Sequence, residues 1–208
     1  MRRALLEIAD ELRGIAQNGL RFSEGPFDLE RYERVLSLAV RLGAVADERS
    51  IEELSRAYRA DEGYVTPKLD VRMAVFRKDG VLLVQERADS RWALPGGFVD
   101  IGDSPSGAAI RETFEEAGVE VRVHRLAGIF DLRLQPEAPP SLFHIHKILF
   151  TGALLDPDAQ PRGGHEVLDA RFFATDALPE LSLSRTLDLH IREAQRVAHD
   201  PGALPYFD

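Results

Sequence analysis

Apolar residues recur at helical spacing over roughly the first 58 residues of the chain and predict two amphipathic helices. The apolar positions are Leu5, Ile8, Ala9, Leu12, Ile15 and Ala16 in the first helix, and Tyr32, Val35, Leu36, Ala39 and Leu42 in the second. Gly25-Pro26 separates the two predicted helices, and Asp28 is the expected N-cap of the second. Ser50-Ile51-Glu52-Glu53 has the pattern of a capping box that opens a third helix. The pattern predicts a helical region at residues 1–64. Because short helices bury little apolar area, we expect it to dock on the rest of the chain or on a second copy.

From Lys68 onward the period changes to that of β-strands, which marks a second domain at residues 65–208. A hairpin is expected from the strand at 71–76, a turn at Lys78-Asp79-Gly80 and the strand at 81–84. Further strands are predicted at 120–124, 125–134, 143–154 and 170–174, with a loop at 135–141. A helix is predicted at Pro105–Ala117, capped by Ser104 and ended by Gly118, and a last helix at 184–198 with Ser184 as its cap.

Composition narrows the class of protein. Hydrophobic residues make up 44% of the chain, there is no cysteine, and the formal net charge is -9. No apolar run approaches the roughly 18 residues of a membrane span, and acidic residues from Glu7 onward interrupt any signal-peptide core. The charge disfavours long nucleic acids as partners, while small phosphate compounds remain compatible with it. We therefore expect a soluble cytoplasmic protein with a small-molecule ligand, no nucleic-acid partner and no membrane partner.

Acidic residues gather on one side of the predicted helix at Pro105–Ala117. At about 100° per residue, Glu112, Glu115 and Glu116 fall within one arc of the helix. The pattern places Ile110, Phe114 and Ala117 on the opposite, core-facing side. Carboxylates at these spacings repel one another, and the C-terminal end of a helix disfavours anions. A bound cation would relieve both effects. Hard oxygen ligands select Mg²⁺, with Mn²⁺ as a substitute.

The stretch around this helix resembles the Nudix box, whose pattern is G-x(5)-E-x(7)-R-E-U-x-E-E-x-G-U with U apolar. The matching positions are Gly97, Arg111, Glu112, Glu115, Glu116, Gly118 and Val119. Two positions depart from the pattern, since Asp103 replaces the first Glu and Thr113 the first apolar residue. Six fixed residue types at set spacing arise by chance about once in 10⁶ starting positions, so the motif is specific.

The resemblance implies roles for individual residues. In Nudix hydrolases the positions that match Glu112, Glu115 and Glu116 bind the metal, helped by a loop carbonyl at the position of Gly96. The position of Arg111 orients the carboxylates, and Arg111 and Glu115 are accordingly expected to take part in catalysis. The position of Asp103 is more structural.

Three further residues are candidates outside the box. Glu166 follows a Gly-Gly pair in a late loop, where the family often supplies an extra metal ligand or general base, although an ordinary surface acid fits the sequence equally well. Arg72 and Arg87 are candidate substrate-binding residues because a guanidinium matches phosphate geometry. Ordinary ion pairing is an equal alternative for each.

The resemblance extends over nearly the whole chain, through Tyr64–Arg72, Trp92–Gly102, Pro139–His144 and Leu178–Arg185, to a Nudix subgroup with a helical N-terminal extension. That subgroup includes CDP-choline and ADP-ribose pyrophosphatases. It implies an α/β/α sandwich with a mixed sheet, a homodimer formed by the N-terminal helices, and hydrolysis of a nucleoside diphosphate linked to a second group. The alternative is a catalytically silent Nudix-like sensor of nucleotide sugars, which the intact Arg111, Glu112, Glu115 and Glu116 disfavour.

Overall fold

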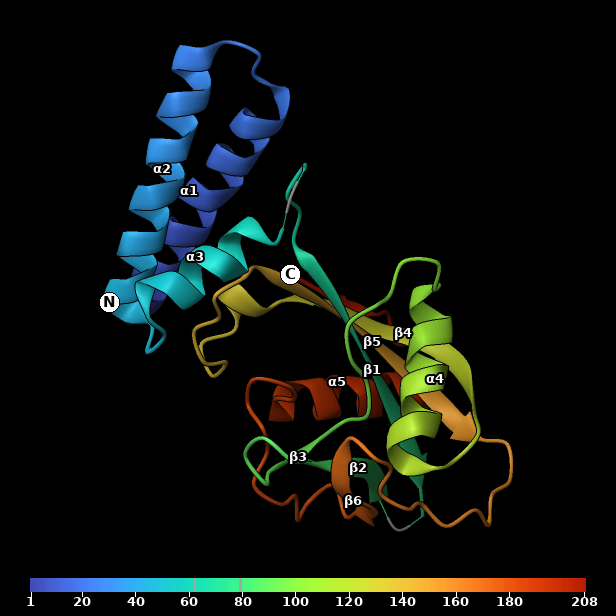
Figure 1. Ribbon diagram of the computed structural model, residues 1–208. Coiled ribbons are helices and arrows are strands. Elements are labelled where there is room, and N and C mark those ends of the chain that lie inside the picture. Colours follow the sequence, from blue (N-terminus) through green and yellow to red (C-terminus); the bar gives the residue numbers. More distant parts are fainter. Residues whose placement is uncertain (62, 79) are drawn as a thin grey trace. The chain divides into compact units, whose positions relative to one another are not determined.

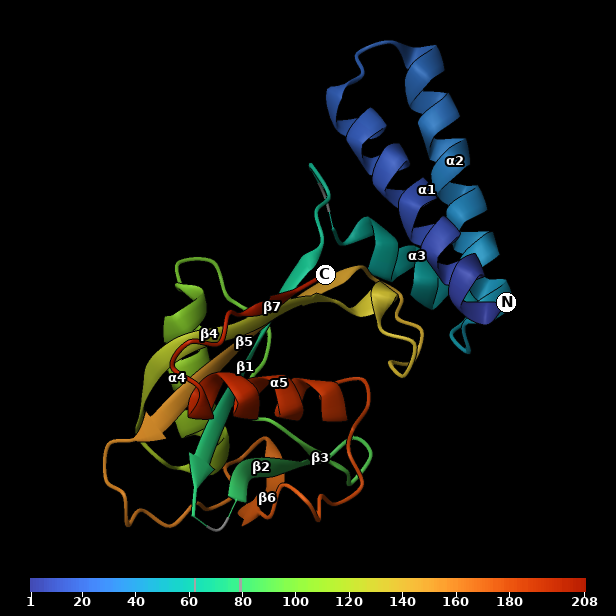
Figure 2. The ribbon, with the colours of Figure 1, turned by 180° about the vertical axis from the view of Figure 1, so that it is seen from behind.

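The computed structural model describes residues 1–61, 63–78 and 80–208, and these divide into two compact units. Unit 1 consists of Met1–Lys68 together with Pro139–Ile145, and unit 2 consists of Leu69–Ala138 together with His146–Asp208. Figures 1 and 2 show the elements of both units from opposite sides. The predicted turn at Lys78-Asp79-Gly80 includes Asp79, which lies outside the described residues.

Unit 1 contains the helices α1 (Arg2–Phe22), α2 (Pro26–Ala46) and α3 (Ile51–Arg59). Both hydrogen bonds of the predicted capping box are present at the start of α3. Asp28 is not the cap of α2, because that helix already starts at Pro26, with Gly25 at the N-cap position. No helix among the described residues is long and apolar enough to cross a membrane.

The core of unit 1 joins the helices to a segment that is distant in sequence. Leu142 and Phe143 pack with Tyr58 and with the facing sides of α1 and α2. The Arg13 guanidinium, which is 2% exposed, lies over the Tyr58 and Phe143 rings and pairs with Asp10 and Asp61. Residues 139–145 therefore belong structurally with the helices, although they lie inside the predicted second domain.

Unit 2 is built on a mixed sheet with the strand order β3-β2-β1-β5-β4-β7, in which β6 also pairs with β2. The strands are β1 (Lys68–Arg77), β2 (Gly80–Glu86), β3 (Trp92–Ala93), β4 (Val121–Asp131), β5 (Ile145–Leu154), β6 (Val167–Phe173) and β7 (Tyr206–Phe207). The β4–β7 pair is parallel, whereas β2 pairs antiparallel with β1, β3 and β6, as β4 does with β5. The helices are α4 (Pro105–Ala117) and α5 (Asp188–His199), with a short 3₁₀ helix at Leu132–Leu134.

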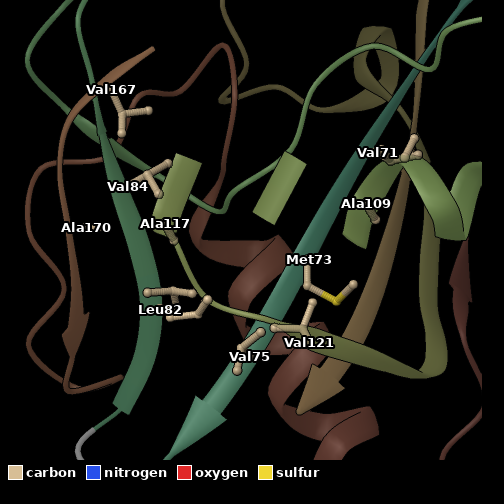
Figure 3. Packing of buried hydrophobic residues seen from close by; sticks show 12 residues of the cluster. Val71, Met73, Val75, Leu82, Val84, Ala109, Ala117, Val121, Val167 and Ala170 are labelled. Atoms are coloured by element: carbon tan, nitrogen blue, oxygen red, sulfur yellow. The ribbon is translucent and has the colours of Figure 1, made fainter. Parts of the chain in front are cut away.

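Two helices cover the two faces of this sheet. Val71, Met73, Val75, Leu82 and Val84 form one face and pack with alanines of α4, as the close view in Figure 3 shows. Residues of the opposite face, among them Ala74, Val81, Leu83 and Leu149, pack with Ile191, Ala194 and Val197 of α5. Unit 2 is thus the expected α/β/α sandwich.

Two predicted elements differ from the structure. The strands predicted at 120–124 and 125–134 are one strand, β4, whose register with β5 shifts twice, and the 3₁₀ helix follows it. The last helix begins at Asp188, so Ser184 does not cap it. The N–H of Leu187 instead donates to Nδ1 of His190, so a side chain of the helix itself accepts a hydrogen bond from the backbone at its N-terminus.

Candidate active site

Helix α4 starts and ends where its sequence predicts. The Ser104 hydroxyl accepts a hydrogen bond from the Gly107 N–H, Pro105 holds the first helical position, and Gly118 ends the helix in the left-handed region at φ 67°. These local signals fix which residues of the acidic segment are helical.

The face that α4 buries is not the predicted one. Ala108, Ala109 and Thr113 are fully buried, whereas Ile110 is 36% and Phe114 53% exposed. The small side chains let the helix approach the sheet closely, and the Thr113 hydroxyl is satisfied by donating to the Ala109 carbonyl. The prediction that Ile110 and Phe114 face the core is therefore wrong, whereas Ala117 is buried as predicted.

A glycine loop passes beside β1 opposite this helix. The N–H groups of Val71 and Met73 donate to the carbonyls of Gly97 and Pro95, so the loop pairs with β1 as a strand would. Gly96 adopts φ 143°, and a Cβ there would lie 2.0 Å from the Val71 carbonyl oxygen. Only glycine fits this position. Its N–H donates to the Glu116 carboxylate at 2.9 Å.

The Glu116 carboxylate is therefore held inside the fold, and its side chain is only 5% exposed. Burial raises its pKa to about 7, against the lowering effects of Arg72 and of the Gly96 N–H, and the charges of Glu86 and Glu112 act in the same direction as burial. A buried anion that shares its surroundings with other carboxylates is costly unless a cation approaches it.

Arg111 organises the more exposed carboxylates of the site. Its guanidinium pairs with Glu112 at 3.0 Å and with Glu115 at 2.9 Å, and it also reaches Asp103 at 3.2 Å and Asp100 at 3.5 Å. Burial raises the pKa of Glu112 in spite of this pairing with Arg111. Asp103 thus reaches Arg111 although its side chain is shorter than the Glu of the family pattern.

The loop that carries Glu166 lies on the C-terminal end of α4. The N–H groups of Arg162 and Gly164 donate to the carbonyls of Ala117 and Glu116. Glu166 is exposed, and its charge contributes to the raised pKa of Glu112. The late loop thereby brings one more carboxylate to the acidic end of the helix.

Of the two candidate phosphate-binding arginines, Arg72 lies inside the fold. Its side chain is fully buried, forms two hydrogen bonds to Asp70, and donates to the Leu94 carbonyl at 3.0 Å. Lys147, also buried, pairs with the same carboxylate at 2.6 Å. Burial raises the pKa of Asp70, but Arg72 and Lys147 outweigh it and lower the value to about 2. These buried contacts favour Arg72 as a residue that holds the glycine loop and disfavour it as a residue that contacts a phosphate.

Arg87, by contrast, is exposed and donates from Nε to the His165 carbonyl, next to Glu166. Sequence analysis missed two other charged residues near the site, Glu86 and Arg185, which form an ion pair at 3.6 Å. The one available signal for Glu86 was its place at the end of β2, in alternation with the inward-facing Leu82 and Val84.

Comparison with known proteins gives two family matches. The NUDIX domain model matches residues 66–193, and a model described as a UDP-X-like, N-terminal oligomerisation domain matches residues 3–58. YjhB of Bacillus subtilis (strain 168), whose name assigns it provisionally as an ADP-ribose pyrophosphatase, is 41% identical over 180 residues, which cover 86% of this chain and 85% of that protein.

Solved structures agree with these matches. A crystal structure of a UDP-X diphosphatase has a TM-score of 0.62 and 32% identity and covers 100% of this chain and 99% of its own. An ADP-ribose pyrophosphatase from Streptococcus suis 89-1591 has a TM-score of 0.61 and 31% identity, over 69% of this chain and 100% of its own. Human diphosphoinositol polyphosphate phosphohydrolase 3-alpha is 45% identical over only 62 residues, 29% of this chain and 38% of that protein. Similarity in that short segment therefore does not identify the substrate.

Proposed function

The chain belongs to the Nudix family and is a hydrolase, and from this premise we propose that it cleaves the diphosphate of a nucleoside diphosphate linked to a second group. The observation that carries the proposal is the buried Glu116 carboxylate, fixed by the Gly96 N–H at 2.9 Å beside the other carboxylates of α4. ADP-ribose and CDP-choline are the leading candidate substrates. The similarity of almost the whole chain to proteins named for ADP-ribose and UDP-X supports a linked nucleoside diphosphate.

The donor set fits a hard divalent cation, and we propose Mg²⁺, with Mn²⁺ as a substitute. Glu112, Glu115 and Glu116 would hold it, with the Gly96 carbonyl as a further oxygen ligand. The Arg111 guanidinium pairs with two of these carboxylates, Glu112 at 3.0 Å and Glu115 at 2.9 Å. When bound, the cation would supply Lewis-acid stabilisation of charge on the phosphoryl oxygens.

Other steps of the hydrolysis would be carried out by side chains of the protein. Hydrolysis forms a bond from a water oxygen to one phosphorus atom and breaks the anhydride bond, giving a nucleoside monophosphate and a phosphorylated partner. We assign Arg111 the task of orienting Glu112 and Glu115, and Glu166 that of accepting the proton from the attacking water. Arg87 positions the Glu166 loop through the His165 carbonyl.

We further propose that the protein is a homodimer formed through α1. Ile8, Ile15 and Phe22 follow one another at intervals of one heptad and are 48%, 51% and 67% exposed. A stripe with this spacing is what a second helix packs against. The match of residues 3–58 to an oligomerisation domain supports this choice of surface.

A substrate panel tests the proposed reaction. ADP-ribose, CDP-choline, a UDP-sugar, NADH, diadenosine polyphosphates, nucleoside triphosphates and capped RNA would be compared by kcat/KM with Mg²⁺, and the products identified. We expect the highest kcat/KM for a linked nucleoside diphosphate, with a nucleoside monophosphate among the products. A clear preference for triphosphates or RNA ends would refute the substrate class, and tight binding without turnover would refute the reaction.

A further inference from the structure

The segment that precedes α5 runs alongside the chain that leads into the glycine loop. The Trp92 N–H donates to the Glu180 carbonyl at 3.0 Å, and the Ser182 N–H donates to the Trp92 carbonyl at 2.8 Å. Closer to the loop, the Leu94 N–H donates to the hydroxyl of the fully buried Thr186 at 2.9 Å. Arg185 is the neighbour of Thr186, so its backbone is fixed close to the loop that holds Glu116.

The Arg185 guanidinium has N–H groups that donate to no acceptor among the described residues. Its side chain is 41% exposed. In the part of the chain that the structure describes, its charged partner is Glu86, at 3.6 Å from Nε, which is too long for a good hydrogen bond. Among the described residues, no side-chain hydrogen bond from Arg185 is found. Arg72 and Arg111 differ from it, because each of them donates several hydrogen bonds to carboxylates. An arginine offers a planar fork of five N–H donors, which suits phosphoryl oxygens.

Glu86 is an unusual partner because it is buried. It is 5% exposed, and its Oε1 atom accepts no hydrogen bond. Glu86 ends β2 on the face that continues Leu82 and Val84, the face covered by α4. It lies close enough to Glu116 and Arg72 to influence both electrostatically. The Glu86–Arg185 pair therefore lies beside the carboxylate site. Glu86 is the buried member of the pair, and the Arg185 side chain is partly open to solvent.

We propose that Arg185 binds a phosphoryl oxygen of the substrate diphosphate and that Glu86 is a positioning residue that holds the guanidinium in place. This inference rests on the proposed function. A site with this many carboxylates repels an anionic substrate, and an arginine that keeps unused donors beside it offsets part of that repulsion. A buried anion next to the guanidinium restricts where that side chain can lie, which lowers the entropy lost when a phosphate binds.

The first test compares Arg185→Met with a matched control, Arg192→Met, in the full-length protein. Arg192 also lies near the start of α5, pairs with Asp188, and is more exposed than Arg185. The probe is α,β-methylene-ADP, whose diphosphate resists hydrolysis, and its Kd would be measured by calorimetry with Mg²⁺. We expect Arg185→Met to raise this Kd by roughly tenfold to a hundredfold, as for the loss of a charge-assisted hydrogen bond. Arg192→Met should change it less than about twofold.

Two further measurements separate phosphate binding from damage to the site. Titration with Mn²⁺ alone should give the same affinity in Arg185→Met as in the wild type, and Arg185→Lys should recover part of the lost affinity for α,β-methylene-ADP. A changed Mn²⁺ affinity in Arg185→Met would overturn the proposal. An α,β-methylene-ADP affinity equal to that of Arg192→Met would overturn it as well.

A double-mutant cycle tests the role of Glu86. If Glu86 acts through Arg185, Glu86→Gln should weaken α,β-methylene-ADP binding in the wild type but have almost no further effect in Arg185→Met. Additive losses would overturn the positioning role.

Failure of the proposed function would look different from failure of this inference. If no linked nucleoside diphosphate is hydrolysed by the wild type, the function fails, whereas the calorimetry still reports whether Arg185 binds a diphosphate. If the wild type hydrolyses such a compound and Arg185→Met binds the analogue normally, the inference alone fails.

Discussion

The backbone N–H of Gly164 donates to the carbonyl oxygen of Glu116 across 2.9 Å, which fastens the loop of Glu166 to the end of the metal-binding helix proposed above. A Cβ at position 164 would lie 1.8 Å from the Glu115 carbonyl oxygen. Gly164→Ala must therefore displace the loop. We expect kcat to fall by roughly tenfold to a hundredfold if Glu166 accepts the proton, since general-base catalysis depends on position.

Steady-state kinetics with the best substrate of the panel, together with a thermal melt, would check this. Gly14→Ala is a suitable control, since a Cβ there meets nothing within 4 Å. If Gly164→Ala keeps full kcat, the loop does not contribute a catalytic group.

The carboxylates of α4 give the second prediction. Glu115→Gln and Glu116→Gln should each lower kcat by at least about a hundredfold while the fold survives, because the lost charge serves the cation and not the core. Asp103→Ala should cost less than about a hundredfold, since Asp103 contacts Arg111 and not the buried carboxylate. Kinetics at saturating Mg²⁺ and circular dichroism measure both effects. Unchanged Mg²⁺-dependent turnover in both glutamine variants would refute the metal assignment.

A pH effect on stability follows from His190. Burial lowers its pKa to about 3 from 6.5, and the positive charges of Lys147 and Arg72 add to this, against the opposite effect of Asp70. Below about pH 6.5 the unfolded chain therefore binds a proton at His190 that the folded protein does not, so the contribution of His190 makes stability fall as the pH is lowered. The raised pKa of Glu116 acts in the opposite direction over part of this range, so the effect of His190 is read as a difference between the wild type and a His190 variant. The slope for one proton is about 1.4 kcal/mol per pH unit.

Urea unfolding of the wild type and of His190→Gln between about pH 7 and pH 5 measures this contribution as the difference between the two slopes, because Glu116 titrates in both proteins. His190→Gln should remove that contribution, and glutamine can still accept the Leu187 N–H as a capping residue. Equal slopes in the two proteins would show that His190 is not the group responsible.

The dimer gives the fourth prediction. Ile8→Glu with Ile15→Glu should turn a homodimer into a monomer at micromolar concentration, because charges would replace the apolar stripe of α1. Leu204→Glu, at a position in unit 2 that is 76% exposed, is the control and should leave the dimer intact. Sedimentation velocity distinguishes the two forms. A wild type that sediments as a monomer would contradict the proposal directly.

Local signals in the sequence predicted more than long-range ones did. Ser104, Pro105 and Gly118 fixed α4 because each acts on neighbouring backbone groups. The orientation of α4 was predicted wrongly because a periodic pattern treats apolar residues as buried, whereas here the helix needs small residues against the sheet and leaves Phe114 outside. A close approach of this kind depends on the partner surface and is absent from the helix's own sequence.

Among the charged residues of the site, too, those related by local spacing could be predicted and those brought together by the fold could not. Glu112 and Glu116 could be found from their spacing within one helix. Asp70 pairs with Arg72 on its own strand and with Lys147 of β5, and the Glu86–Arg185 pair joins the end of β2 to the segment before α5. No periodicity relates Lys147 to Asp70 or Arg185 to Glu86, so only the fold brings these pairs together.

The membership of Pro139–Ile145 in unit 1 has a consequence for how the chain acquires its structure during synthesis. The three N-terminal helices leave the ribosome first, but Leu142 and Phe143, which complete their core, emerge only after half of unit 2 has been made. The three helices therefore cannot complete their core until the segment that ends at Ile145 has been made, and a nascent chain that pauses before residue 142 would expose the Tyr58 face of the helices to chaperones.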